Sequence, residues 1–381
     1  MPPAISTAPP TDVIVIGGGV IGCSIALRLA ERGLHVAVYD RGEPGAEASA
    51  AAAGMLAPQG EMTQPNAFFE LAAASRDLYP DFVRHVEVLS GQRVGLRRDG
   101  TMMVALSEDE ERAHEDIFRG QTQAGLPLDR LTARQARALV PQLSSDVRSA
   151  LFVAGDHWLD NERLAKALAA ACRRAGVALF ANSRVTALEA SDGTVTGVRV
   201  SKTGGRDGAL RAAAQYVLAA GAWSAQLAAP LGLSLGVEPC RGQMIEFEGA
   251  PDFPLIVRAG HHYLVPRANG RLLAGTTAEQ AGFEKNVTGE GLRSILEGTI
   301  RLTPLVRSLR FRRAWAGLRP DTLDHFPILG RGMFRNLVFA TGHFRNGILL
   351  APITAQLISE LLLTGHTSHP IEAYSPARFE H

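Results

Sequence analysis

The sequence predicts an α/β fold combined with antiparallel β structure: a parallel-sheet domain whose chain is interrupted by insertions that form a second domain. Near the N-terminus, an apolar run at residues 12–16 ends at glycines and is followed by a helical pattern over 20–32 and another apolar run over 34–40. Residues 237–285 instead alternate apolar and polar side chains in short segments, which is typical of antiparallel strands. A chain of 381 residues is long enough for two or three domains.

The N-terminal pattern predicts one βαβ unit. Short β-branched runs that lead into glycines are typical of buried parallel strands. Ile21, Ile25 and Leu29 recur at helical spacing, and Gly33 is expected to end the helix. Residues 12–40 are therefore expected to form a strand, a helix and a second strand.

Later segments continue the alternation of strands and helices. The predicted helices are 159–175, 289–302 and 348–363, and the predicted strands include 215–220, 312–317 and 337–341. Two hairpins are predicted around Asp99-Gly100 and Asp192-Gly193, because Asp-Gly pairs between alternating segments are typical of tight turns.

These elements predict a discontinuous nucleotide-binding domain. It is expected to comprise residues 11–85, 150–225 and 315–370. The two insertions, 86–149 and 226–314, are expected to form a mainly antiparallel domain that binds the substrate.

The glycines after the first strand follow the pattern Gly17-x-Gly19-x-x-Gly22. Gly17 permits a tight turn, Gly19 lets a pyrophosphate approach the backbone, and Gly22 lets helix and strand pack closely. The helix N-terminus offers free N–H groups and a partial positive charge to phosphates. Asp40 closes the second strand, where a carboxylate accepts hydrogen bonds from ribose hydroxyls. The pattern predicts a Rossmann-like dinucleotide site but does not distinguish FAD from NAD.

Composition narrows the possible partners. The formal net charge of +1 predicts neither nucleic acid nor an anionic membrane as a partner. No run of 18 purely apolar residues occurs, so no membrane-spanning helix is expected. Cys23, Cys172 and Cys240 have the spacing of neither a metal site nor a redox pair, so no metal is predicted and the cysteines are expected to be buried. The scarcity of cysteine favours a reducing compartment, the cytoplasm.

Four further stretches narrow the choice of dinucleotide. They are residues 51–58 (AAAGMLAP), 217–224 (VLAAGAWS), 315–322 (WAGLRPDT) and 341–350 (TGHFRNGILL). With these stretches the chain resembles the D-amino acid oxidase family of FAD-dependent amine oxidoreductases, and within it the glycine oxidases, over about residues 11–372. The C-terminal third contains no cysteine, so a cysteinyl bond to the flavin is not expected there.

The resemblance implies a fold, a reaction and partners. The fold would be a Rossmann-like FAD-binding domain with an inserted, mainly antiparallel substrate domain, and FAD would be held noncovalently. The reaction would be oxidative deamination of glycine, or of small amines and D-amino acids such as sarcosine, to the imine or glyoxylate with release of hydrogen peroxide. The resemblance also implies a homotetramer, a role in supplying the thiazole of thiamine, and a thiazole synthase as a candidate partner.

For the substrate, the resemblance implies Arg319 and Tyr263 on the carboxylate, Arg345 as a second arginine, and Met55 in the pocket. A guanidinium fork suits a carboxylate, because it can donate two parallel hydrogen bonds. Arg319 is expected in a loop between the strand at 312–317 and Pro320. No side chain is expected to act as a catalytic acid or base, since the flavin N5 carries the chemistry.

For the cofactor, the glycine pattern and the resemblance together imply a long set of contacts. Asp40 and Arg41 would lie near the pyrophosphate and adenosine, and Val185 near the adenine. The full set is Gly17, Gly19, Val20, Ile21, Gly22, Asp40, Arg41, Ala48, Ser49, Ala53, Gly54, Met55, Val185, Gly221, His343, Phe344, Arg345, Asn346, Gly347, Ile348 and Leu349. One departure from the family pattern is Ala278, where a methionine is usual, and it is expected to affect the volume of the pocket.

Two other functions remain open at this stage. One is a D-amino acid or sarcosine dehydrogenase that passes electrons to a quinone or a carrier protein at a membrane. The other is a flavin-bearing protein without turnover. Oxygen uptake compared with dye reduction separates the oxidase from the dehydrogenase, and anaerobic bleaching of the flavin by glycine excludes the third.

Overall fold

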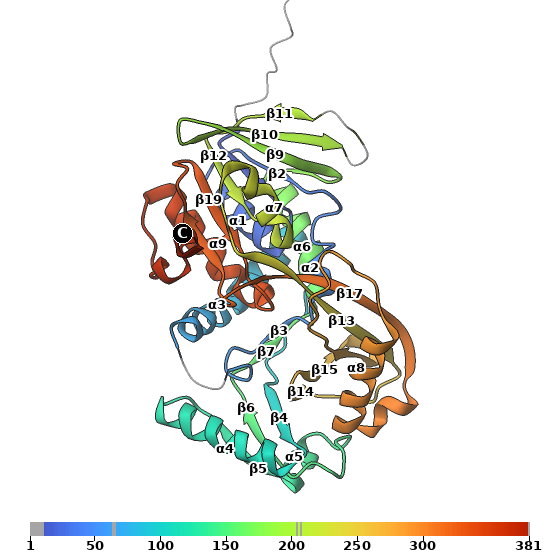
Figure 1. The fold of residues 1–381 in the computed structure, drawn as a ribbon. Coiled ribbons are helices and arrows are strands. Elements are labelled where there is room, and N and C mark those ends of the chain that lie inside the picture. The colour runs from blue at the N-terminus through green and yellow to red at the C-terminus, as the bar shows by residue number, and fades with distance from the viewer. Residues whose placement is uncertain (1–10, 63–65, 203–204, 206–207, 380–381) are drawn as a thin grey trace, which may run out of the picture.

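The computed structural model describes residues 11–62, 66–202, 205 and 208–379, and it confirms the predicted fold class. Two main sheets lie one above the other, a mostly parallel sheet in the upper half of Figure 1 and a mostly antiparallel sheet in the lower half. The strands β13 (Val237–Glu248) and β17 (Arg310–Thr322) run as a long pair from the middle of the molecule into the lower half. The candidate site lies where the two halves meet.

The upper sheet has six strands with β1 in its interior. Its order is β18 (Ile328–Arg331), β19 (Leu337–Thr341), β12 (Gln215–Leu218), β1 (Val13–Ile16), β2 (Val36–Tyr39) and β8 (Ala178–Phe180). All neighbouring pairs are parallel except β18 with β19, which is antiparallel. In such sheets, ligands bind at the carboxyl ends of the strands, and β1 ends at the glycine turn.

Alternate residues of β1 supply two separate cores, because side chains of a strand point to opposite faces. Val13 and Val15 lie in a core shared with four helices, whereas Ile14 and Ile16 lie in a core on the other face. The helices are α1 (Val20–Ala30), α3 (Ala67–Ser90), α6 (Asn161–Arg174) and α9 (Gly347–Thr364). Burial on both faces accounts for the unbroken apolar runs of these strands.

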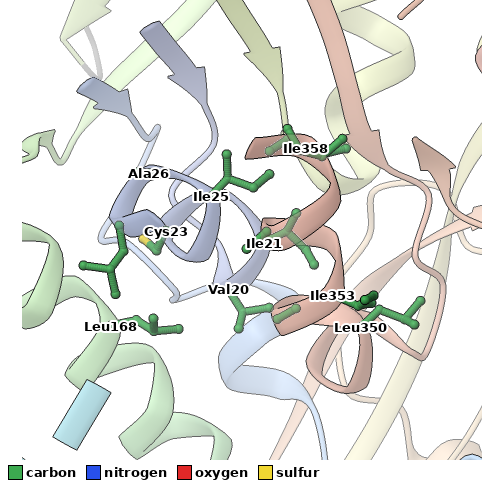
Figure 2. Close-up of a cluster of buried hydrophobic side chains, with 14 of the residues drawn as sticks. Val20, Ile21, Cys23, Ile25, Ala26, Leu168, Leu350, Ile353 and Ile358 are labelled. Carbon is green, nitrogen blue, oxygen red and sulfur yellow. The ribbon is translucent and has the colours of Figure 1, made fainter. Parts of the chain in front are cut away.

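Figure 2 shows the centre of the helical core, where the apolar side chains of α1 meet those of α9 and α6. Val20 and Ile21, at the start of α1, belong to the same buried cluster as Leu350 and Ile353 of α9, and the two helices are in contact. The start of α1 is thereby fixed against a helix from the other end of the chain.

Helix α9 has the length and apolar composition of a membrane span, although the sequence contains no purely apolar run of that length. Most of this helix is buried inside the protein, where it packs against α1 and α3. The place of α9 in the core accounts for its apolar composition, so this composition is weak support for a membrane span.

A three-stranded sheet covers the other face of the upper sheet. It consists of β9 (Ser183–Ser191), β10 (Thr194–Lys202) and β11 (Ala209–Arg211), with β10 in the middle. The hairpin predicted at Asp192-Gly193 is confirmed, and both turn residues have positive φ, at 50° and 68°. Such values are typical of two-residue hairpin turns.

The lower sheet has eight strands and is antiparallel except where β14 pairs with β4. Its order is β17, β13, β16 (Arg271–Gly275), β15 (His262–Arg267), β14 (Ile256–Ala259), β4 (Thr101–Ala105), β6 (Ser149–Val153) and β5 (Asp129–Thr132). Its core includes α5 (Ala133–Leu139) and α8 (Gly289–Leu302), whereas α4 (Glu108–Gln123) packs beside β4 and β6. The remaining strands and α-helices of the described residues are short: α2 (Ala48–Ala51), β3 (Met55–Leu56), β7 (His157–Trp158) and α7 (Ser224–Ala228).

The structure differs from two local expectations of the sequence. The hairpin predicted around Asp99-Gly100 is wrong, because β4 pairs with β6 and β14 and not with the residues before it. The loop predicted for Arg319 is also wrong, since β17 continues to Thr322 and pairs Arg319 with Cys240. Pro320 is tolerated because β17 is an edge strand, which needs no donor on its outer side. The domain limits stay predictions. Two of the proposed borders, at residues 149/150 and 314/315, fall inside β6 and β17, which are strands of the lower sheet.

Candidate cofactor and substrate site

The glycine turn after β1 contains glycines of two kinds. Gly17 has a φ of 105°, and a Cβ there would collide with the carbonyl of Ala219. A Cβ at Gly22 would collide with the carbonyl of Gly17. Gly19 differs, because its φ is −69° and a Cβ there would meet only Ser49 Oγ, at 3.4 Å. The protein itself therefore needs glycine at 17 and 22, whereas glycine at 19 leaves space for something outside the chain.

Asp40 shapes this turn from the end of β2. Its Oδ2 accepts a hydrogen bond from Gly18 N at 2.7 Å, and its Oδ1 accepts one from Gly42 N at 2.8 Å. Burial raises the pKa of the Asp40 carboxyl, and the two backbone donors partly offset that effect. The carboxylate is held at the edge of the cavity, in the position expected for a ribose ligand.

One cavity begins at this turn and extends to the residues expected to bind substrate. Every predicted site residue except Gly22 lines it. The lining residues are Gly17, Gly19, Val20, Ile21, Asp40, Arg41, Ala48, Ser49, Ala53, Gly54, Met55, Val185, Gly221, Tyr263, Arg319, His343, Phe344, Arg345, Asn346, Gly347, Ile348 and Leu349. Gly22 lies behind the turn, where it has the packing role expected for it. Contact of these residues with bound molecules stays a prediction.

The segment 49–54 forms one wall of the cavity, and its carbonyl groups are held from behind. Five of its carbonyl oxygens accept hydrogen bonds from other parts of the chain: Ser49 and Ala50 from Asn161 Nδ2 at 2.8 and 3.0 Å, Ala51 from Trp315 Nε1 at 3.1 Å, Ala53 from Arg267 Nη2 at 2.6 Å, and Gly54 from Leu159 N at 2.9 Å. The wall is thus fixed before any ligand is bound.

Arg267 and Asn161, which hold the cavity wall from behind, are residues that the sequence analysis missed. Arg267 is buried, and burial lowers the pKa of its guanidinium to about 10. It also donates to Asn161 Oδ1 at 3.0 Å and to Pro266 O at 3.0 Å. These contacts join residues far apart in the sequence, and no local pattern indicates them.

Arg319 projects from β17 across β13 toward the cavity. A Cβ at Gly242 of β13 would collide with its guanidinium, so glycine there gives the side chain its path. Nη1 donates to Thr277 O at 2.9 Å and Nη2 donates to Thr276 Oγ1 at 2.8 Å. A guanidinium has five N–H donors, so this arrangement orients the group and leaves donors for an anion.

Tyr263 lies on β15 at the same end of the cavity. Its hydroxyl donates to Met244 Sδ at 3.2 Å, and Met244 also lines the cavity. Burial raises the pKa of the Tyr263 hydroxyl, while the charge of Arg319 lowers it. The hydroxyl is therefore a neutral donor close to a cation, which suits a carboxylate ligand.

Arg345 meets an acidic residue that the sequence analysis did not single out. Its Nε lies 3.5 Å from Glu61 Oε2, and its side chain is 50% exposed. Arg258 lines the same region and donates from Nη1 to Gly60 O at 2.8 Å. Burial lowers the pKa of the Arg258 guanidinium.

The structure bears on His343, which was not expected to act as a base, and on Ala278, which was expected to affect the volume of the pocket. His343 is buried with its Nε2 3.1 Å from Thr354 Oγ1, and burial lowers its pKa to about 3, so it is a neutral residue and not a base near pH 7. The expectation for Ala278 is wrong, because this residue is exposed and does not line the cavity, whereas Thr276 two residues earlier does.

Known proteins match this chain over nearly its whole length. The sequence model of the family described as FAD dependent oxidoreductase matches residues 12–361. A glycine oxidase from Geobacillus kaustophilus is 34% identical over 96% of this chain and 97% of its own, and one from Pseudomonas putida is 36% identical over 92% and 94%. The crystal structure of the Geobacillus kaustophilus enzyme has a TM-score of 0.90, with 96% of this chain and 98% of that chain covered.

The chain belongs to the FAD-dependent oxidoreductase family, as its resemblance to D-amino acid oxidases predicted. FAD is accordingly its cofactor, and the residues present fit the group. The space kept open by Gly19 lies beside the start of α1, where a pyrophosphate would meet N–H groups. None of the three cysteines, all buried and free, lines the cavity, so the side chains at the site offer no thiol for a bond to the flavin.

Proposed function

We propose that this protein oxidises glycine, and with it small amines and D-amino acids such as sarcosine, to the imine, with release of hydrogen peroxide. The observation that carries the proposal is that Arg319 and Tyr263 both line the cavity that begins at the FAD turn. Curated relatives at 32–36% identity over nearly the whole chain are named glycine oxidase.

The side chains of the protein hold the substrate in this reaction. Arg319 and Tyr263 hold the substrate carboxylate, so that the α-carbon has one orientation in the bound state. Met55 and Met244 add apolar side chains to the wall of the same cavity. Bound FAD supplies the hydride acceptor and the route of the electrons to oxygen.

An oxygen electrode tests the reaction directly. We expect the purified yellow protein to consume oxygen with glycine or sarcosine and to produce one hydrogen peroxide for each substrate oxidised. Failure of every small amine and D-amino acid to bleach the bound FAD without oxygen would overturn the proposal. Dye reduction without oxygen uptake would instead support a dehydrogenase.

We also propose that the product supplies the thiazole of thiamine. Curated relatives named Bifunctional protein ThiO/ThiG support this; one from Trichormus variabilis is 36% identical over 97% of this chain, which spans about half of that protein's length. A thiazole synthase is therefore a candidate partner. Loss of the gene is expected to slow growth without thiamine, and added thiazole is expected to restore it.

We also propose a cytoplasmic location and a homotetrameric assembly. A cytoplasmic location is supported by cysteines that are free and buried, as expected in a reducing compartment. A homotetramer is proposed from the family resemblance. Cell fractionation tests the first, and light scattering of the FAD-bound protein tests the second.

A further inference from the structure

The substrate end of the cavity carries more positive charge than a carboxylate needs. Arg319, Arg345 and Arg258 all line it. Glu61 is the acidic residue beside them, and its side chain is only 16% exposed. A site of three cations alone would suit a simple anion, whereas a cation site with one carboxylate suits a molecule that carries both charges.

The backbone that carries Glu61 is fixed by two side chains from the lower sheet and its neighbours. Gly60 N donates to Asp156 Oδ2 at 3.0 Å, and Gly60 O accepts from Arg258 Nη1 at 2.8 Å. Asp156 is fully buried, and a Cβ at Gly60 would come within 2.6 Å of its carboxylate. Because both the N–H and the carbonyl of Gly60 are held, the fold sets the position of the backbone at Glu61.

The partner that Glu61 has in the structure can be displaced. Its Oε2 lies 3.5 Å from Arg345 Nε, which is longer than a good hydrogen bond, and the Arg345 side chain is half exposed. A long contact to a half-exposed cation contributes little free energy, although Glu61 itself is mostly buried. A ligand cation that enters the cavity can therefore compete with Arg345 for the carboxylate.

The charges of Glu61 and Arg319 both affect the Tyr263 hydroxyl. The charge of Arg319 lowers the pKa of the Tyr263 hydroxyl, and the charge of Glu61 raises it. Tyr263 is thus within electrostatic reach of both, so a small zwitterion bound at Tyr263 has a cation site and an anion site around it.

We propose that Glu61 binds the amino group of the substrate and selects amino acids over simple carboxylic acids. Arg319 and Tyr263 would hold the carboxylate, and Glu61 would accept a hydrogen bond from the substrate ammonium. This inference rests on the proposed function in its choice of substrate, but it concerns only how the two charged ends are recognised.

The test compares Glu61→Gln with the unchanged protein, both loaded with FAD. The KM for glycine is expected to rise at least about tenfold, since a hydrogen bond to a charged group is lost. The Kd for acetate, which has the carboxylate but no nitrogen, is expected to stay the same or fall. Glu61→Asp, which keeps the charge, is expected to lie between the two for glycine. Binding of acetate is followed by the absorbance of the bound FAD.

A matched control removes one carboxylate from an ion pair outside the cavity. Glu115 pairs with Arg130 at the protein surface, and Glu115→Gln is expected to change neither constant. Equal changes for glycine and acetate in Glu61→Gln, or no change in either, would overturn the inference. If another amino acid proves to be the substrate, the same comparison uses that amino acid and the carboxylic acid that lacks its amino group. The proposal of glycine as substrate is then wrong, but the comparison still tests the role of Glu61. If nothing reduces the FAD, the Kd values of glycine and acetate are compared instead.

Discussion

At the scale of single residues, Arg319 is oriented before any substrate binds. Thr277 O and Thr276 Oγ1 each accept one of its N–H groups, and Gly242 gives the side chain its path. These contacts lie at the substrate end and not along the glycine turn. A change at Arg319 should therefore affect the substrate and spare the cofactor.

We expect Arg319→Ala to fold and to keep FAD, with a much higher KM for glycine. Loss of a charged hydrogen bond worth about 1.5–3 kcal/mol corresponds to about tenfold to 150-fold in affinity. Turnover should fall too, because the α-carbon is held loosely. Arg319→Lys should rescue only part of the effect, since a point charge cannot replace a planar fork. Steady-state kinetics with unchanged KM and turnover in Arg319→Ala would refute the assignment.

His343 is one residue at which pH should affect stability. Its pKa is lowered to about 3 by burial, whereas an exposed histidine has a pKa near 6.5. Between these values the unfolded chain binds a proton that the folded protein does not. Stability is therefore lost as pH falls from about 6.5 toward 3, by at most about 1.4 kcal/mol per pH unit from this group.

Urea unfolding at saturating FAD from pH 7 to pH 5 measures this effect. His343→Asn should show a shallower loss of stability than the unchanged protein over that interval. His366→Asn is the control, because His366 is exposed at the surface. Equal slopes for all three proteins would show that His343 does not dominate the acid response.

At the scale of elements, the turn between β1 and α1 permits a contrast between two glycines. A side chain at Gly19 has room in the protein but occupies the space expected for the pyrophosphate, whereas one at Gly22 collides with the turn itself. Gly19→Val should therefore be folded and colourless, while Gly22→Val should be unstable. Circular dichroism and the released FAD per chain separate the two. A full FAD content in Gly19→Val would show that the pyrophosphate lies elsewhere.

The wall at 49–54 allows a second test at this scale. Asn161→Ala removes the donor to Ser49 O, which is buried, and to Ala50 O, which is partly buried; an unpaired buried carbonyl costs about 1–3 kcal/mol. Both the Tm and the affinity for FAD should fall. Asn286→Ala, at an exposed asparagine, serves as the comparison and should change neither. Titration of the FAD-free protein with FAD is the measurement; an unchanged Kd in Asn161→Ala would argue against a role of this wall in binding.

At the scale of the whole molecule, local patterns predicted part of the structure well. The glycine turn and Asp40 lie within one βαβ unit, and α8 and β19 have the bounds that periodicity predicted. Contacts between distant segments were not predictable. Arg267 reaches Ala53 across 214 residues, and Glu61 meets Arg345, which is far from it in the sequence. Gly317 and Pro320 are residue types that usually end a strand, so the sequence predicted an end at residue 317. The strand β17 continues to Thr322 because it lies at the edge of the sheet, where Pro320 needs no N–H donor.

The central place of β1 in the upper sheet also has a consequence for synthesis on the ribosome. Its neighbour β12 begins at Gln215, the next strand β19 begins at Leu337, and the cavity wall is complete only at Leu349. In a growing chain β1 can pair with β2 at once, but its other edge stays unpaired until β12 has been made, and the cavity wall is incomplete until residue 349 has emerged. A chain ended after Asn336 should bind no FAD and precipitate in cells, which pull-down of FAD and a solubility assay would reveal. We therefore expect FAD to bind only chains that contain the segment 341–349, so shorter products should be colourless.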